Sequence, residues 1–195
     1  YVNFLTSSVN VILEHEVDAH LEVVHVEETI IYDEITTTSD ALRVQRFRDD
    51  RKDIILNNSN SENENFILVH ALLGRHVGGG IAYIDTICDS KWGFGITSDI
   101  QGTFQNFGLD TIFDMFYYAH ELGHSLGSGH TYDAYEPSVD DCGRVCTLSE
   151  EMKSDPVGLP LDNSATIMSY CNFCSGGARA SLPALRGSEH PGDPA

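Results

Sequence analysis

The chain has 195 residues, of which 41% are hydrophobic, and its formal net charge at pH 7 is −19. This length and composition predict one folded domain with a substantial core. The negative charge repels phosphate backbones and anionic lipids, which argues against a nucleic-acid or membrane-surface partner. The longest apolar stretch, residues 66–73, is too short to cross a bilayer. Calcium binding would fit the acidity, but no calcium-binding motif accompanies it.

Helical and extended patterns alternate at the start of the chain. Residues 3–15 carry apolar side chains at helical spacing, namely Leu5, Val9, Ile12 and Leu13. Residues 17–32 are rich in Val and Ile and predict extended chain, with a central strand of the sheet at residues 21–26.

A second helix is predicted from Asp40, which is placed to cap it, to about Leu56. Its inward-facing side chains are expected to be Leu42, Val44 and Phe47. The polar residues that follow, 57–65, predict a surface loop.

Two strands and a loop are predicted next. Residues 66–73 predict a buried strand, in which His70 is expected to be a core histidine with satisfied hydrogen bonds. Glycines at 78–80 interrupt the chain before a short strand at residues 81–85. Residues 91–107 contain several glycines and predict a loop.

The last predicted helix extends from about Asp110 to Leu126, with a capping box formed by Thr111 and Asp114. Its apolar stripe consists of Ile112, Met115, Phe116, Ala119, Leu122 and Leu126. Alternating helices and strands before this helix predict an α+β fold with a mixed sheet.

The pattern H-E-x-x-H-x-x-G-x-x-H extends from His120 to His130. His120 and His124 lie one turn apart on one helix face and can bind a single metal ion. Gly127 can end the helix in a left-handed conformation, so that His130 reaches the same ion from outside the helix. Three imidazoles on Zn²⁺ leave one position for water, which is typical of a catalytic site.

Glu121 is the predicted general base. It follows the first histidine and is expected near the open metal position, where it accepts a proton from water and later passes it to the leaving amine. The alternative is a helix with ordinary surface histidines. The five fixed positions would arise in roughly one of ten thousand shuffled chains, which favours the metal site.

These residues resemble the zinc signature of the metzincin metallopeptidases. Residues 166–171 are similar to the methionine turn of that clan, with Met168 as the methionine. Within the clan, the chain most resembles the adamalysin or reprolysin branch (ADAM-like catalytic domains), through Gly78–Ile84 and Cys88. The resemblance covers about residues 1–175. It implies a metzincin-like fold with a mixed twisted sheet, an active-site helix and an irregular C-terminal subdomain.

The resemblance implies roles for residues outside the zinc signature. An edge strand over the cleft is expected to bind substrate through Gly80, Ile81, Ala82 and Tyr83, although an ordinary structural strand is the alternative. In some metzincin branches a tyrosine two residues after the methionine stabilises the oxyanion, which suggests a catalytic role for Tyr170. Adamalysins generally do not use one, so a packing role is the alternative.

The chain departs from the family pattern at three places. Thr131 follows the third histidine, where the family often has an acidic residue. The catalytic domain, residues 1–175, is expected to lack the family's first strand and last helix. Residues 176–195 read as a flexible tail rich in Gly and Pro.

The five cysteines are Cys88, Cys142, Cys146, Cys171 and Cys174. Resemblance to a secreted family favours disulfides that join the segment after the third histidine to the methionine turn, with Cys88 left over. A second zinc site built from the other four cysteines is the alternative.

The leading hypothesis is a secreted, monomeric zinc endopeptidase that acts on proteins or peptides. The alternatives are a catalytically inactive, zinc-containing binding module of the same fold, and a structural zinc domain held by the four late cysteines. The presence of Glu121 argues for catalysis, since a binding module has no use for the base.

Overall fold

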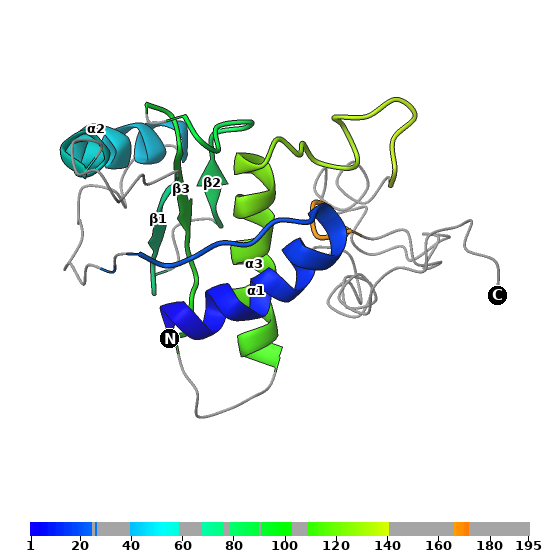
Figure 1. The fold of residues 1–195 in the computed structure, drawn as a ribbon. Helices are drawn as coiled ribbons and strands as arrows, with labels where there is room; N and C mark the ends of the chain where they lie inside the picture. The colour runs from blue at the N-terminus through cyan, green and yellow to red at the C-terminus, as the bar shows by residue number, and fades with distance from the viewer. Residues whose placement is uncertain are drawn as a thin grey trace. The chain divides into compact units, whose positions relative to one another are not determined.

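The computed structural model describes residues 1–24, 26, 40–58, 68–75, 79–89, 91–102, 109–140 and 166–171. The chain forms two compact units, Tyr1–Ser128 and Gly129–Ala195. The predicted tail, residues 176–195, lies outside the described residues. The regular elements of the first unit are α1 (Val2–Val17), α2 (Asp40–Asn58), β1 (Val69–Leu72), β2 (Ile81–Ala82), β3 (Phe94–Thr97) and α3 (Leu109–Ser125) (Figure 1). These helices and a small sheet agree with the predicted α+β class.

The sheet is mixed because β3 pairs in parallel with β1 and antiparallel with β2. The strand order β1-β3-β2 places β3 in the centre, and all its residues are buried. The loop predicted for residues 91–107 is therefore wrong at this strand. At Gly95 of this strand, the His70 ring occupies the position of the missing side chain. A Cβ on Gly95 would lie 2.6 Å from Nδ1 of His70.

Opposite faces of the sheet pack against different helices. Phe94 of β3 contacts Phe47 of α2 edge-on, with ring centroids 5.9 Å apart. On the other face, His70 of β1 contacts Tyr118 of α3, with ring centroids 5.1 Å apart. The core on the α2 side consists of Val44, Phe47, Phe94 and Ile96. Because side chains alternate along a strand, α2 and α3 cover the two faces separately.

The inward positions predicted for α2 are confirmed for Val44 and Phe47, which are 2% and 4% exposed. The prediction is wrong for Leu42, which is 46% exposed. Residues two positions apart in an α-helix are separated by about 200° around its axis, so Leu42 lies on the face opposite to Val44.

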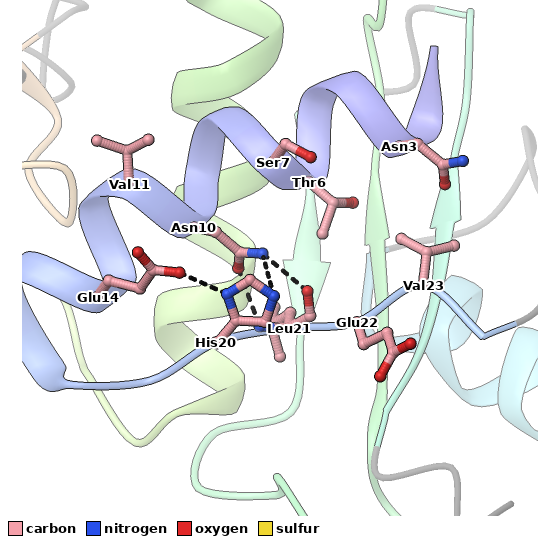
Figure 2. A pocket seen from close by; sticks show the side chains of 10 residues that line it. All are labelled: Asn3, Thr6, Ser7, Asn10, Val11, Glu14, His20, Leu21, Glu22 and Val23. Carbon is pink, nitrogen blue, oxygen red and sulfur yellow. Dashed lines mark hydrogen bonds and ion pairs between the residues drawn. The ribbon is translucent and has the colours of Figure 1, made fainter.

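Helix α1 packs against α3 (Figure 1). Of its predicted apolar positions, Leu5, Val9 and Leu13 are buried, whereas Ile12 is only half-buried. Asn10 of α1 binds the chain that follows this helix. Its Nδ2 donates to the Leu21 carbonyl at 2.8 Å, and the Leu21 N–H donates to its Oδ1 at 2.9 Å (Figure 2). A groove of about 310 Å³ lies along this contact, lined by α1 and residues 20–23 (Figure 2).

The central strand predicted at residues 21–26 is wrong for the described residues 21–24 and 26, which are not part of the sheet. The physical reason is that the amide of Asn10 satisfies the backbone of Leu21, as a neighbouring strand would otherwise do. Val24 and Val26, expected in the sheet, are 52% and 51% exposed.

Asp114 connects α3 to the chain that leaves the central strand. Its carboxylate is fully buried and accepts the backbone N–H groups of Gln101 at 3.0 Å and Gly102 at 3.1 Å, and the Tyr1 hydroxyl. The predicted capping box is wrong, because α3 begins at Leu109, two residues before Thr111. Asp114 therefore sets the position of α3 against the sheet and does not cap the helix.

His70 lies in β1 and is half-buried, and the prediction that its hydrogen bonds are satisfied holds for one ring nitrogen but not for the other. Nε2 lies 2.8 Å from the Thr97 hydroxyl, whereas Nδ1 is buried without a hydrogen-bond partner among the described residues. Burial lowers the pKa of His70 to about 3. The ring is therefore neutral at neutral pH.

We expect His70 to make the domain less stable in acid. Because its folded-state pKa is about 3, below an unfolded value of about 6.5, its contribution is complete above pH ~6.5 and is lost as the pH falls toward about 3. Between pH 6.5 and 4.5 the loss is about 2 kcal/mol. Urea unfolding at these two pH values should show a correspondingly smaller loss for His70→Gln. Equal losses of stability in the wild type and in His70→Gln would contradict the lowered pKa of His70.

Candidate metal and active site

His120 and His124 lie one turn apart on α3, as the sequence predicts. They are 6% and 7% exposed, and their ring centroids are 4.8 Å apart. Nδ1 of His124 lies 2.8 Å from the carbonyl oxygen of Ser128. Since a carbonyl only accepts hydrogen bonds, Nδ1 must carry the proton. Nε2 of His124 therefore keeps the lone pair that a metal ion requires.

The turn after α3 provides that carbonyl. The N–H of Ser128 donates to the Gly123 carbonyl and the N–H of Gly127 donates to the His124 carbonyl, both at 2.9 Å. This pair of bonds is a Schellman motif, and it requires a left-handed residue at Gly127, whose φ is 102°. The predicted role of Gly127 as the helix terminator is confirmed.

The loop after β2 caps the same helix end. The N–H of Asp85 donates to the His124 carbonyl, and those of Thr86 and Ile87 donate to the Ser125 carbonyl, each at 3.0 Å. The predicted strand over residues 81–85 is shorter than expected, because β2 ends at Ala82 and the chain then turns toward α3. These bonds satisfy carbonyls that α3 leaves open and attach the loop to the histidine-bearing turn.

Glu121 follows His120 and is 5% exposed. Its side chain packs against Gly80, the first of the predicted substrate-binding residues: a Cβ on Gly80 would lie 2.5 Å from Cγ and Cδ of Glu121. Ile81 and Ala82 form β2, which among the described strands pairs with β3 alone. Gly80, at the start of the predicted edge strand, and the predicted base are therefore neighbours within the first unit.

The second unit contains His130, whose ring stacks on Tyr132 with centroids 5.3 Å apart and planes 10° apart. The Tyr170 ring centroid is 4.5 Å from that of His130. Nδ1 of His130 lies 3.5 Å from the Tyr132 hydroxyl and 3.9 Å from a carboxylate oxygen of Asp133. Burial and the Asp133 charge raise the pKa of Tyr132. Polar groups thus lie at Nδ1 of His130, which leaves Nε2 as the ligand atom.

Met168 belongs to the same unit and is 8% exposed. Its carbonyl accepts the N–H of Thr131 at 3.2 Å. The segment that resembles a methionine turn is therefore bonded to the residue directly after the third histidine. Tyr170, two residues further along, contacts the His130 ring.

Thr131 takes a structural role that its sequence neighbourhood did not indicate. Its hydroxyl donates to the carboxylate of Asp140 and accepts the Thr166 hydroxyl at 3.2 Å. Thr131 and Asp140 are 7% and 6% exposed. A buried acidic group thus lies beside the residue after the third histidine, although it comes from nine positions further along the chain. No local pattern marks such a pair, so sequence reasoning missed it.

The ligand atoms of His120, His124 and His130 all lie within 4.8 Å of one another. Nitrogen ligands about 2.0–2.1 Å from a tetrahedral zinc ion are about 3.4 Å apart. Neutral imidazole nitrogens are also the donors that zinc prefers. Within the described residues, the three histidines are thus a donor set that can bind a metal ion.

A helix that carries two of three clustered histidines, with a buried carboxylate between them, defines the metallopeptidase class of site. The chain belongs to the metallopeptidase family M12B, reprolysin-like, whose family model matches residues 1–131. The match includes the complete pattern from His120 to His130, so the predicted resemblance to the reprolysin branch is confirmed. Met168 and Tyr170 lie beyond the matched residues.

Family membership implies zinc as the metal and proteins or peptides as substrates. No helix among the described residues combines the length and apolar character needed to cross a bilayer.

We expect Thr131→Val to destabilise the protein by about 1–3 kcal/mol, because it removes a hydroxyl donor from the buried Asp140 carboxylate at nearly constant volume. Thr131→Ser keeps the hydroxyl and is the matched control. Urea unfolding at pH 7 measures both. If the serine variant lost as much stability as the valine variant, the lost methyl and not the hydrogen bond would be responsible.

Proposed function

We propose that this domain is a zinc-dependent endopeptidase in which Glu121 is the general base. The observation that carries the proposal is the cluster of three imidazoles with a buried carboxylate next to the first of them. Membership of a metallopeptidase family supports the same reaction class. The bond cleaved is a peptide bond of a protein or peptide substrate.

His120, His124 and His130 would hold the zinc ion. Zinc bound there would lower the pKa of its water toward neutrality and polarise the substrate carbonyl. Ser128 would act on the ligand His124, because its carbonyl accepts the Nδ1 proton at 2.8 Å and so holds the imidazole in the ligating tautomer.

Glu121 would move the protons of the reaction. It accepts a proton from the attacking water and then donates it to the departing amine, two steps for which a carboxylate can alternate between its charged and neutral forms. Its side chain is enclosed beside Gly80 and 5% exposed. Little bulk water can therefore compete for the proton that Glu121 carries.

The strand β2 would bind the substrate backbone. Gly80, Ile81, Ala82 and Tyr83 follow one another along this strand and its ends, and β2 pairs with β3 alone among the described strands. An extended peptide could add to its other edge through main-chain hydrogen bonds. The proximity of Gly80 to Glu121 would then bring that peptide to the base.

Met168 and Tyr170 would support the third ligand. The Met168 carbonyl holds the backbone after His130, and the Tyr170 ring lies 4.5 Å from the His130 ring centroid. A phenol in this position would donate a hydrogen bond to the oxyanion of the substrate. Tyr170 is thus a candidate catalytic residue, and Met168 a positioning residue.

The domain would act outside the cell, as is typical of reprolysin-like domains. In support, Cys171 is 1% exposed and disulfide-bonded, whereas Cys88 is a free and exposed thiol. Disulfides persist in oxidising compartments. A monomer suits this proposal, because the proposed ligands and base all come from one chain.

Zinc content tests the metal ligands. The purified protein should hold one zinc per chain after dialysis, and His124→Ala should bind zinc at least about 100-fold more weakly because a ligand is lost. His15, whose side chain is 72% exposed on α1, supplies the control substitution His15→Ala. Equal zinc binding in both variants would remove His124 from the ligand set.

Hydrolysis of a quenched protein substrate tests the base. Glu121→Gln keeps the shape of the side chain but cannot accept the proton, so kcat/KM should fall by about 10²–10⁴-fold or more while zinc content is unchanged. If wild type and variant both bind zinc and are folded by circular dichroism, yet neither cleaves, the protein is a zinc-containing binding module.

A further inference from the structure

We propose that Gly80 is a positioning residue for Glu121, in a role separate from any contact with substrate. Its missing side chain leaves the space that the Glu121 side chain fills, and this packing fixes the carboxylate beside the edge strand. The inference rests on the proposed function in one respect only, namely that Glu121 is the base.

The contact is close and involves the carboxylate end of the Glu121 side chain. A Cβ built on Gly80 would meet Oε1, Cδ and Cγ of Glu121 at or within 2.5 Å, nearer than real Cβ atoms approach other atoms. Alanine at this position must therefore displace the Glu121 carboxylate or the strand. The site has no room for both.

Strand geometry explains why Gly80 meets α3. Ile81 belongs to the core on the α2 side, and successive residues of an extended chain point to opposite faces. Gly80 and Ala82 therefore face α3, the helix that carries Glu121. Ala82 confirms this direction, because its Cβ lies 3.2 Å from the Cβ position of Gly95 on the face that His70 shares with Tyr118.

The segment that holds Gly80 is anchored and cannot easily retreat. The hydroxyl of Ser98 donates to the carbonyl of the preceding residue, Gly79, and Ser98 is fully buried at the end of β3. On the other side, Ile81 is paired with Ile96 of β3. With both neighbours held by the central strand, a larger side chain at position 80 would displace Glu121 instead.

Backbone conformation does not account for the glycine at position 80. The glycines of the described chain with positive φ are Gly79, Gly102 and Gly127, and Gly80 is not among them. Gly79 shows the opposite combination, since its φ is 86° but a Cβ there would meet nothing within 4 Å. Steric space therefore selects glycine at 80, and backbone conformation selects glycine at 79.

This difference supplies a matched pair of variants. Gly80→Ala should lower kcat by at least about tenfold, because a displaced base is a mispositioned catalytic group, while KM changes less than about twofold. Gly79→Ala introduces backbone strain one residue away without touching Glu121, so kcat should stay within about twofold of wild type. Zinc content should equal that of wild type in both variants.

A stability cycle tests the packing independently of catalysis. Thermal unfolding should show that Gly80→Ala lowers the midpoint in the wild-type background and has little effect in a Glu121→Ala background, where the space is open. Gly79→Ala should lower the midpoint equally in both backgrounds. The Glu121→Ala backgrounds also keep the test readable if Gly80→Ala alone fails to fold.

The outcomes separate the two proposals. Loss of kcat in Gly80→Ala together with the background-dependent midpoint supports the positioning role. An equal loss of stability in both backgrounds, or unchanged kcat in Gly80→Ala, overturns it. If the wild-type protein binds zinc but does not cleave, the proposed function fails, and the stability cycle still decides whether Gly80 fixes the Glu121 side chain.

Discussion

The hydrogen bonds at the C-terminal end of α3 are the constraint on which the rest of the site depends. The loop after β2 donates three backbone N–H groups to the carbonyls of His124 and Ser125, and the Schellman turn at Gly127 satisfies the Gly123 carbonyl and gives that of His124 a second donor. A helix end leaves such carbonyls open, so the surrounding chain must supply donors. Here the donors come from the chain that follows the edge strand, and the helix that carries two histidines is thereby joined to β2.

The polar side of α3 shows how a fold can bury groups that usually stay exposed. Asp114 and Glu121 are 0% and 5% exposed, and each carboxylate lies against specific neighbouring groups. Asp114 accepts backbone N–H groups from the chain after β3, whereas Glu121 packs in the space that Gly80 leaves. Burying a carboxylate is costly unless other groups compensate. The buried carboxylate of Asp114 holds α3 in place, and the buried carboxylate of Glu121 is placed to act as the proposed general base.

In the second unit, hydrogen bonds and ring contacts organise the chain around His130. Thr131 contacts Met168 through its backbone and Asp140 through its hydroxyl, so two distant segments are bonded to the residue that follows the third histidine. The Tyr132 and Tyr170 rings contact the imidazole itself. A histidine outside a helix lacks a regular backbone to fix it, and these contacts restrict its ring instead.

The sequence by itself determined α1, α2, the position of α3, the spacing of the three histidines and the terminating role of Gly127. Helical periodicity, glycine conformation and metal-ligand spacing are local properties, and a short window of residues contains them. Only the tertiary structure decided that Phe94–Thr97 is the central strand, that residues 21–24 stay outside the sheet, and that Gly80 meets Glu121. Each of these depends on a partner far along the chain: the ring of His70 over Gly95, the amide of Asn10 at Leu21, and the carboxylate of Glu121. Local patterns carry no record of such partners, because a glycine that makes space for a distant side chain looks like any other glycine.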